Sequence, residues 1–452
     1  MHALSQMKRD PHDYSLAARG GHERAAALVP VNFFILAVLF FAVGIAAAPL
    51  LVPRVVANYF YGPWQLAIVH TFTLGWITAS IMGVMYRYAP ALVRRPLPFP
   101  RLAVAQLVLF FIGASGMVSH FAIGIWLGIW LAALVMLASV VLFAVNLLPL
   151  LWPQLGAGVA ETGMFAAIWF LLAAATLGLL LAMDKSYGFM GGSLLTNLGA
   201  HAALAAAGWV TVAICAVSYR MLPAFILPAV PLPRAAIYQL YALIVGVVGL
   251  AATLLAGVRG ATVWAVLIAL SLLAYLATMA RLMRTRRMAL DWTARHALAG
   301  FVWLGASAAA AVALAGGGAS SLEGSRLAAA FGAAGLLGFF SNFIIGMSYH
   351  LFAGFVVRAR SAAGWVAVRA ESLGTARPRL FVFVAFNAGV LALSAGLMAG
   401  AATVGTAGAA LAALGGLVYA AVTLRTLSFA YRSAAPGEPG SPALSGTGAR
   451  SR

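Results

Sequence analysis

Long apolar stretches recur along the whole chain, and they constrain the fold more than any other feature. Each is about 20 residues long, which at 1.5 Å rise per residue matches the roughly 30 Å hydrocarbon core of a bilayer. Backbone polar groups in lipid must be paired within their own segment, so each stretch is predicted to be a helix. We predict twelve transmembrane helices, at 30–53, 63–86, 101–122, 124–148, 162–183, 196–220, 235–256, 260–282, 297–315, 327–352, 379–400 and 404–424.

The composition of the chain agrees with this prediction. Hydrophobic residues make up 64% of the sequence and charged residues only 8%, whereas about a quarter of a typical soluble domain is charged. We therefore predict an all-α polytopic membrane protein with a membrane domain at 30–425. Residues 1–29 are predicted to form a cytoplasmic N-terminal segment. The Pro-, Gly- and Ser-rich residues 426–452 are predicted to be a disordered cytoplasmic tail.

The net charge of +19 indicates topology and not nucleic-acid binding. With the N-terminus in the cytoplasm, all but four of the 28 lysines and arginines fall on the cytoplasmic side. The exceptions are Arg54, Lys185, Arg259 and Arg326. This distribution follows the positive-inside rule and predicts that both termini are cytoplasmic. The lipid bilayer is therefore the predicted partner, and no nucleic acid is expected.

The second predicted helix is repeated later in the chain. A shift of 133 residues aligns 75–91 with 208–224, and nine of the seventeen positions are identical. A further shift of 130 residues reaches a weaker copy at 338–355. These copies are predicted helices 2, 6 and 10, so we predict three four-helix repeats at 30–148, 160–283 and 295–425. An even number of helices in each repeat makes the repeats parallel, in contrast to inverted-repeat transporters.

Both of the stronger copies contain a glycine and end in Tyr-Arg-x-x-Pro. The tyrosine is interpreted as part of the interfacial aromatic belt, the arginine as a cytoplasmic anchor and the proline as the end of the helix. Gly75 and Gly208 are predicted to allow the close approach of a neighbouring helix or a flat cofactor, with helix packing the commoner reason.

Histidines are the main candidates for chemistry, because ionisable groups within a membrane are costly and usually functional. No Asp or Glu falls in the middle of a predicted helix, but four histidines lie within or at the edge of one. The predicted topology places His70, His120 and His201 at one depth near the outer side, and His350 at the inner side. Neutral imidazole binds metals and haem iron. We predict His70 and His201 as cofactor ligands, with hydrogen-bonded packing as the alternative for each, and His350 as an interfacial polar residue.

At this point the chain resembles subunit I of the haem–copper oxidase superfamily. The resemblance comprises the twelve helices, the three parallel repeats, the histidines near the outer ends of helices 2 and 6, and the stretch "HTFTLGWITASIMGVMYRYAP" at 70–90. It implies that His70 matches the axial ligand of the low-spin haem and that His201 matches a copper-binding histidine. It also implies a bacterial-type inner membrane, a respiratory setting and an electron-donating or companion membrane subunit.

Other ligands of that family are missing from this sequence. Phe331 and Ala333 occupy the positions of its helix-10 His-x-His motif, and the seventh predicted helix contains Tyr238 and Tyr241 but no histidine pair. Ala205 stands where the family has a tyrosine after the helix-6 histidine. Reduction of dioxygen or nitric oxide by the family mechanism is therefore not expected, and the resemblance leaves open whether the chain is an enzyme.

Three functions remain as alternatives. The first is a haem-binding, redox-related membrane protein. The second is a copper-handling protein with a metal site formed by His201, His120 and Met117, because imidazole and thioether groups suit Cu(I) and Met117 and His120 share a helix face. The third is a cofactor-free transporter or scaffold with the same fold.

Overall fold

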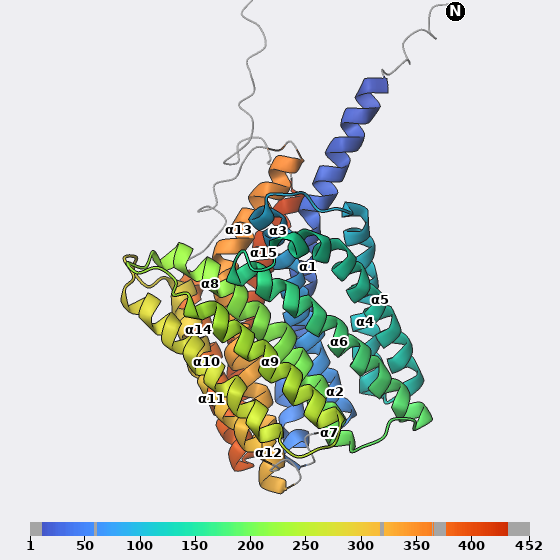
Figure 1. Cartoon of the computed structure of the whole chain (residues 1–452), viewed down its shortest axis with the longest axis vertical. Helices are drawn as coiled ribbons and strands as arrows, with labels where there is room; N and C mark the ends of the chain where they lie inside the picture. The colour runs from blue at the N-terminus through green and yellow to red at the C-terminus, as the bar shows by residue number, and fades with distance from the viewer. Residues whose placement is uncertain (1–10, 58–60, 317–320, 364, 366–376, 433–452) are drawn as a thin grey trace, which may run out of the picture.

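The computed structural model describes residues 11–57, 61–316, 321–363, 365 and 377–432 (Figure 1). Within these residues the fold is helical, with one isolated β-bridge between Pro228 and Arg286. The helical segments are α1 (Pro11–Ala57), α2 (Pro63–His70), η1 (Thr71–Thr78), α3 (Ala79–Val93), α4 (Pro100–Ile123), α5 (Trp126–Leu151), η2 (Trp152–Gln154), α6 (Val159–Tyr187), α7 (Leu194–Ala202), η3 (Ala203–Thr211), α8 (Val212–Ile226), α9 (Ala235–Leu255), α10 (Ala261–Arg284), α11 (Trp292–Ala315), α12 (Leu322–Ala333), η5 (Ala334–Ser341), α13 (Asn342–Ala362), α14 (Arg377–Ala399), α15 (Ala402–Ser428) and η7 (Phe429–Tyr431).

These segments form twelve spans that are long and apolar enough to cross a membrane, which confirms the predicted all-α polytopic membrane fold. Several spans are longer than predicted. Helix α1 begins at Pro11, within the predicted N-terminal segment, and α15 continues to Ser428, within the predicted tail. Residues 433–452 of that tail and residues 1–10 lie outside the described part of the chain.

The first and last spans pack against each other, and the end of the last span contacts the middle of α1. Gly416 of α15 lies against Phe41 and Ile45 of α1, and the Tyr431 hydroxyl donates a hydrogen bond to the Asn32 side chain. We call this end of the bundle, from which α1 protrudes in Figure 1, the terminal end, and the opposite end the distal end.

Spans 2, 6 and 10 each contain a π-helical segment in their middle, which the sequence did not predict. The segments η1, η3 and η5 begin at Thr71, Ala203 and Ala334 and end at Thr78, Thr211 and Ser341. Their last residues are separated by the same 133 and 130 residues that relate the sequence copies. Because π-helical turns are rare and occur often at functional sites, these three segments distinguish the central spans from the other nine.

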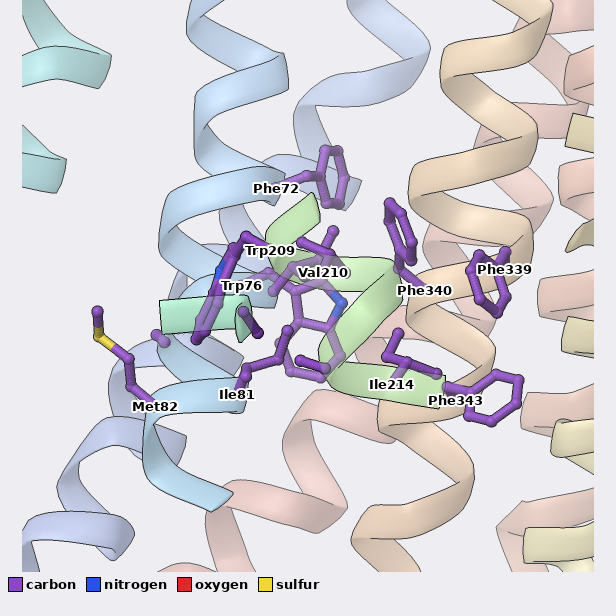
Figure 2. Packing of buried hydrophobic residues seen from close by; sticks show 14 of the residues in the cluster. Phe72, Trp76, Ile81, Met82, Trp209, Val210, Ile214, Phe339, Phe340 and Phe343 are labelled. Atoms are coloured by element: carbon purple, nitrogen blue, oxygen red, sulfur yellow. The ribbon is translucent and has the colours of Figure 1, made fainter. Parts of the chain in front are cut away.

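Hydrogen bonds join the ends of the three π segments to one another. The Trp76 indole donates to the Ser341 hydroxyl over 3.0 Å, and the Trp209 indole donates to the Thr78 hydroxyl over 2.9 Å. Phe339 occupies the third corresponding position and has no such donor. Figure 2 shows Trp76, Trp209 and Phe339 in this region, with Ile81, Ile214 and Phe343 on neighbouring turns. This buried layer ties spans 2, 6 and 10 together in the middle of the bundle.

Glycines in the same segments allow aromatic side chains of neighbouring helices to pack closely. A Cβ atom at Gly75 would lie 2.2 Å from ring atoms of Phe40 in α1. A Cβ at Gly208 would lie 2.6 Å from Phe170 in α6. Gly338 faces Trp303 of α11 in the same manner, with a 2.5 Å approach. The predicted close approach at Gly75 and Gly208 is therefore helix packing against an aromatic ring.

The interpretation of the Tyr-Arg-x-x-Pro ending as an interfacial anchor is wrong for its tyrosine and proline. Tyr86 and Tyr219 are each only 3% exposed and lie inside the bundle, where the Tyr219 hydroxyl donates to Gln239. Pro90 and Pro223 lie within α3 and α8, which continue for three residues beyond them. The residue that follows each helix is left-handed, Arg94 after α3 and Leu227 after α8.

Candidate functional site

The candidate site lies near the distal end, where spans 2 and 6 change from α-helix to π-helix. His70 is the last residue of α2, and His201 is the next-to-last residue of α7. Both side chains are half-buried. The two rings are close enough for their charges to interact. The structure therefore places the two histidines that the sequence singled out at the same end of the bundle, within electrostatic range of each other.

Each of these imidazoles is held through its Nδ1 atom by a main-chain carbonyl. His70 Nδ1 lies 2.7 Å from the Leu66 carbonyl oxygen, and His201 Nδ1 lies 3.0 Å from the Ala174 carbonyl oxygen in α6. Since a carbonyl can only accept a hydrogen bond, Nδ1 must carry the proton in both rings. In the neutral ring, Nε2 then keeps its lone pair, which is the arrangement of most metal-bound histidines.

Neighbouring helices fix the orientation of both rings. His201 lies in a notch on α6, because a Cβ atom at Gly178 would come within 2.8 Å of its Cε1 atom. His70 packs against Phe121 of α4, with ring centroids 4.6 Å apart. Met117 is buried one turn before Phe121 on α4, so it faces the same side as that ring. A thioether is therefore placed on the helix that flanks His70.

His120 is placed differently from the other two predicted ligands. Its Nδ1 atom lies 2.7 Å from the Gly116 carbonyl oxygen of its own helix. Its ring rests on Gly128 of α5, where a Cβ atom would lie only 2.3 Å from Nε2. The ring thus fills a gap between α4 and α5, whereas the adjacent Phe121 faces His70.

Aromatic and cationic side chains surround this end of the bundle. The Lys185 ammonium group lies 5.4 Å from the Tyr61 ring centroid and 5.6 Å from that of Trp126. Trp126 also packs edge-on against Phe121. Tyr238 and Tyr241 of α9 do not contribute, because they are 71% and 44% exposed on the outside of the bundle.

A fully buried histidine was missed by the sequence analysis. His296 is 0% exposed, and its Nδ1 atom donates to the Asn342 side-chain oxygen over 2.8 Å. Asn342 and Asn387 also exchange hydrogen bonds with each other. The hydropathy prediction began this helix at 297, because arginines precede it, whereas α11 begins at Trp292 with Asp291 as its N-cap. The Asp291 N-cap was the sequence signal that could have placed His296 inside the helix.

His350 lies at the terminal end, as the sequence predicted for an interfacial polar residue. It is exposed, its Nε2 atom lies 2.6 Å from an Asp291 carboxylate oxygen, and its ring stacks on Phe225. Burial by itself would raise the pKa of Asp291. The hydrogen bonds from His350 and the Ala294 amide and the nearby Arg379 charge outweigh that effect and lower it below its ordinary value of 3.8.

Within the described residues, no group of three or more His, Cys, Asp or Glu side chains is arranged to hold a metal ion. The candidate site is therefore a pair of imidazoles with thioether and aromatic neighbours. Comparison of the chain with models of known protein families and with curated proteins finds no match. The function must be argued from the site itself.

Proposed function

We propose that this chain is a redox-related membrane protein in which His70 and His201 hold a metal centre at the distal end of spans 2 and 6. The observation that carries the proposal is the pair of imidazoles at one end of the bundle, within electrostatic range of each other, whose Nδ1 atoms are both hydrogen-bonded to main-chain carbonyls. This arrangement leaves the two Nε2 lone pairs as the donor set.

Haem iron is the proposed occupant, in keeping with the resemblance to subunit I of the haem–copper oxidases. His70 and His201 would hold the haem iron through neutral imidazole nitrogens, and apolar and aromatic neighbours such as Phe121 would suit its macrocycle. When bound, such a group would carry an electron. The residues of this chain would ligate the iron, orient the two rings and exclude water.

Copper is the second candidate occupant, and the position of Met117 favours it. Met117 is buried on the face of α4 that also carries Phe121, the ring against His70. Two imidazoles and a thioether suit Cu(I). His120 contributes less to this proposal, because its ring rests on Gly128.

The proposal includes an arrangement in the membrane. The fold is proposed to consist of three parallel four-helix repeats, supported by the similar spacing of the three π segments, whose last residues are 133 and 130 residues apart. Both termini are proposed to lie in the cytoplasm of a bacterial-type cell, supported by the basic residues at the terminal end. A companion membrane subunit would then supply electrons from outside the chain.

Optical spectra of the detergent-purified protein test this function, recorded oxidised and dithionite-reduced. We expect a Soret band that is lost in His70→Ala and His201→Ala and retained in His350→Ala, a control histidine at the terminal end. Protection of the buried Cys215 from a thiol dye shows whether each variant is folded. A folded wild type without a Soret band and without copper contradicts the proposal and leaves transport or a scaffold role.

A further inference from the structure

Two neighbouring loops at the terminal end carry a cluster of exposed arginines. One loop joins α8 to α9 and the other joins α10 to α11 (Figure 1). The arginines on these loops and on the adjoining helical turns are all exposed: Arg234, Arg281, Arg284, Arg286, Arg287 and Arg295. We call these six residues the arginine cluster.

Main-chain hydrogen bonds between the two loops hold the cluster in one shape. The Ala229 amide donates to the Thr285 carbonyl over 2.8 Å, and the Arg287 amide donates to the Ile226 carbonyl over 3.2 Å. The first loop also contains three prolines, each of which fixes its own φ. The backbone under the arginines is therefore formed in advance, so a ligand that binds there orders side chains and little else.

The positive charge of the cluster is not balanced by acidic side chains. Asp291 is the only Asp or Glu between positions 185 and 322. Its carboxylate already accepts hydrogen bonds from the His350 side chain and the Ala294 amide. Among the described residues, none of the six arginines forms an ion pair with a carboxylate. A concentration of like charge on one surface attracts anions.

Most of the guanidinium groups in the cluster are also free to bind a ligand. Arg286 donates to the Met283 carbonyl, and Arg295 donates to the Leu290 carbonyl. The other four guanidinium groups donate to no group in the described part of the chain. A guanidinium presents its donors in a planar fork that matches two oxygens of one phosphate. The cluster thus suits a phosphate ligand.

The position of the cluster indicates where that phosphate comes from. Span 8 ends at Arg284 and span 9 begins at Trp292, so the cluster lies where two spans end. The Arg295 guanidinium lies 4.6 Å from the Trp292 ring centroid, and tryptophan is enriched at the level of lipid headgroups. Leu227 and Met288, on the same two loops, are 51% and 50% exposed. Basic and apolar groups side by side suit a phospholipid better than a soluble anion.

We propose that the arginine cluster binds the headgroup phosphate of an anionic phospholipid, with Leu227 and Met288 against the glycerol and the first carbons of its acyl chains. Clusters of about four to eight basic residues next to a transmembrane helix are typical of anionic-lipid sites. The cluster lies at the opposite end of the bundle from His70 and His201. Its test is therefore independent of the proposed metal centre.

Lipid binding is measured by native mass spectrometry of the delipidated full-length protein in detergent, with phosphatidylglycerol as the probe and phosphatidylcholine as the control lipid. We expect phosphatidylglycerol to bind more tightly than phosphatidylcholine. Arg284→Gln/Arg287→Gln should weaken phosphatidylglycerol binding at least about tenfold. The matched control is Arg94→Gln/Arg95→Gln, which removes two exposed arginines from the α3–α4 loop at the same end and should bind as wild type.

Three results of that experiment would overturn the proposal. The first is equal binding of the two lipids by the wild type. The second is an equal loss of affinity in the two double variants, which would mean that any positive charge at this end has the same effect. The third is binding of glycerol phosphate as tight as that of phosphatidylglycerol, which would assign the cluster to a soluble phosphate. Protection of Cys215 from a thiol dye shows that each variant is folded.

Hydrogen exchange of the wild type tests the location of the site without any variant. The full-length protein is compared in nanodiscs of phosphatidylcholine alone and in nanodiscs that also contain phosphatidylglycerol. We expect phosphatidylglycerol to slow amide exchange in peptides that cover 285–291 and to leave peptides that cover 94–99 unchanged. Unchanged exchange at 285–291, or an equal change in both loops, contradicts the proposal.

Discussion

Replacement of Gly75 by alanine should destabilise the protein because the added methyl group has no space. Its Cβ would lie 2.2 Å from Cγ and Cδ1 of Phe40 and 2.5 Å from Phe40 Cβ. Ordinary contacts between carbon atoms are about 3.5–4.0 Å. Because Phe40 Cβ is fixed to the backbone of α1, a rotation of the ring cannot relieve the clash. Helix α1 itself must move away from span 2.

The expected loss follows from two opposing terms. Overpacking a core typically costs about 1–3 kcal/mol, whereas alanine in place of glycine within a helix gains about 0.5–1 kcal/mol. We expect Gly75→Ala to lose about 1–2 kcal/mol. Gly208→Ala should lose less, because its nearest contact is 2.6 Å. Gly332→Ala in α12 is the matched control, because no atom lies within 4 Å of an added Cβ, and it should be neutral or slightly stabilised.

The assay is thermal unfolding in detergent, followed by the reaction of Cys215 with a thiol dye. Cys215 is the only cysteine in the chain and is fully buried, so its reactivity reports opening of the bundle. The predicted order of stability is Gly332→Ala, then Gly208→Ala, then Gly75→Ala. If Gly75→Ala is as stable as Gly332→Ala, spans 1 and 2 are not packed as described.

Three further predictions concern buried polar groups and pH. Trp76→Phe removes the donor to Ser341 and should lower the free energy of unfolding by about 1–3 kcal/mol, since a buried hydrogen bond and some packing are lost. Trp152 is 65% exposed, so the control Trp152→Phe should change the unfolding temperature little. Asn342→Leu leaves the His296 Nδ1 donor and the Asn387 side-chain oxygen without their partners and should cost at least about 2 kcal/mol. Adding His296→Phe should recover part of the loss in a double-mutant cycle, and strictly additive losses would count against the network. Because folding lowers the pKa of Asp291, its carboxylate stabilises the fold above pH 3.8, and this contribution is lost as the pH falls through the lowered value. Asp291→Asn should therefore lose less stability at acid pH than the wild type does. If the variant and the wild type lose the same stability at acid pH, the pairing with His350 is refuted.

The sequence was sufficient to predict the membrane fold because hydropathy depends on local composition. Apolar stretches of about 20 residues gave all twelve spans, and the largest errors at their ends lie where charged or proline residues are inside a helix. Pro90 illustrates this limit, since α3 continues past it to Val93. The π segments were not predicted, because hydropathy does not distinguish a π-helix from an α-helix.

The candidate site was predictable in part. The predicted topology placed His70 and His201 at equal depth in the bundle, and in the structure both lie near the distal end, within electrostatic range of each other. The different setting of His120 depends on Gly128 in the next helix, a contact that spacing alone does not specify. His296 was assigned to a loop because hydropathy windows shorten a helix that begins beside arginines.

The central claim is that His70 and His201 bind a metal centre, and the metal content of the purified protein tests it most directly. Iron and copper per chain are measured for the wild type, His70→Ala, His201→Ala and the control His350→Ala, each shown to be folded by Cys215 protection. The account predicts stoichiometric iron, or copper in its place, in the wild type and the control, and its loss from both distal variants. A folded wild type with neither metal, or retention of the metal in both distal variants, would contradict it.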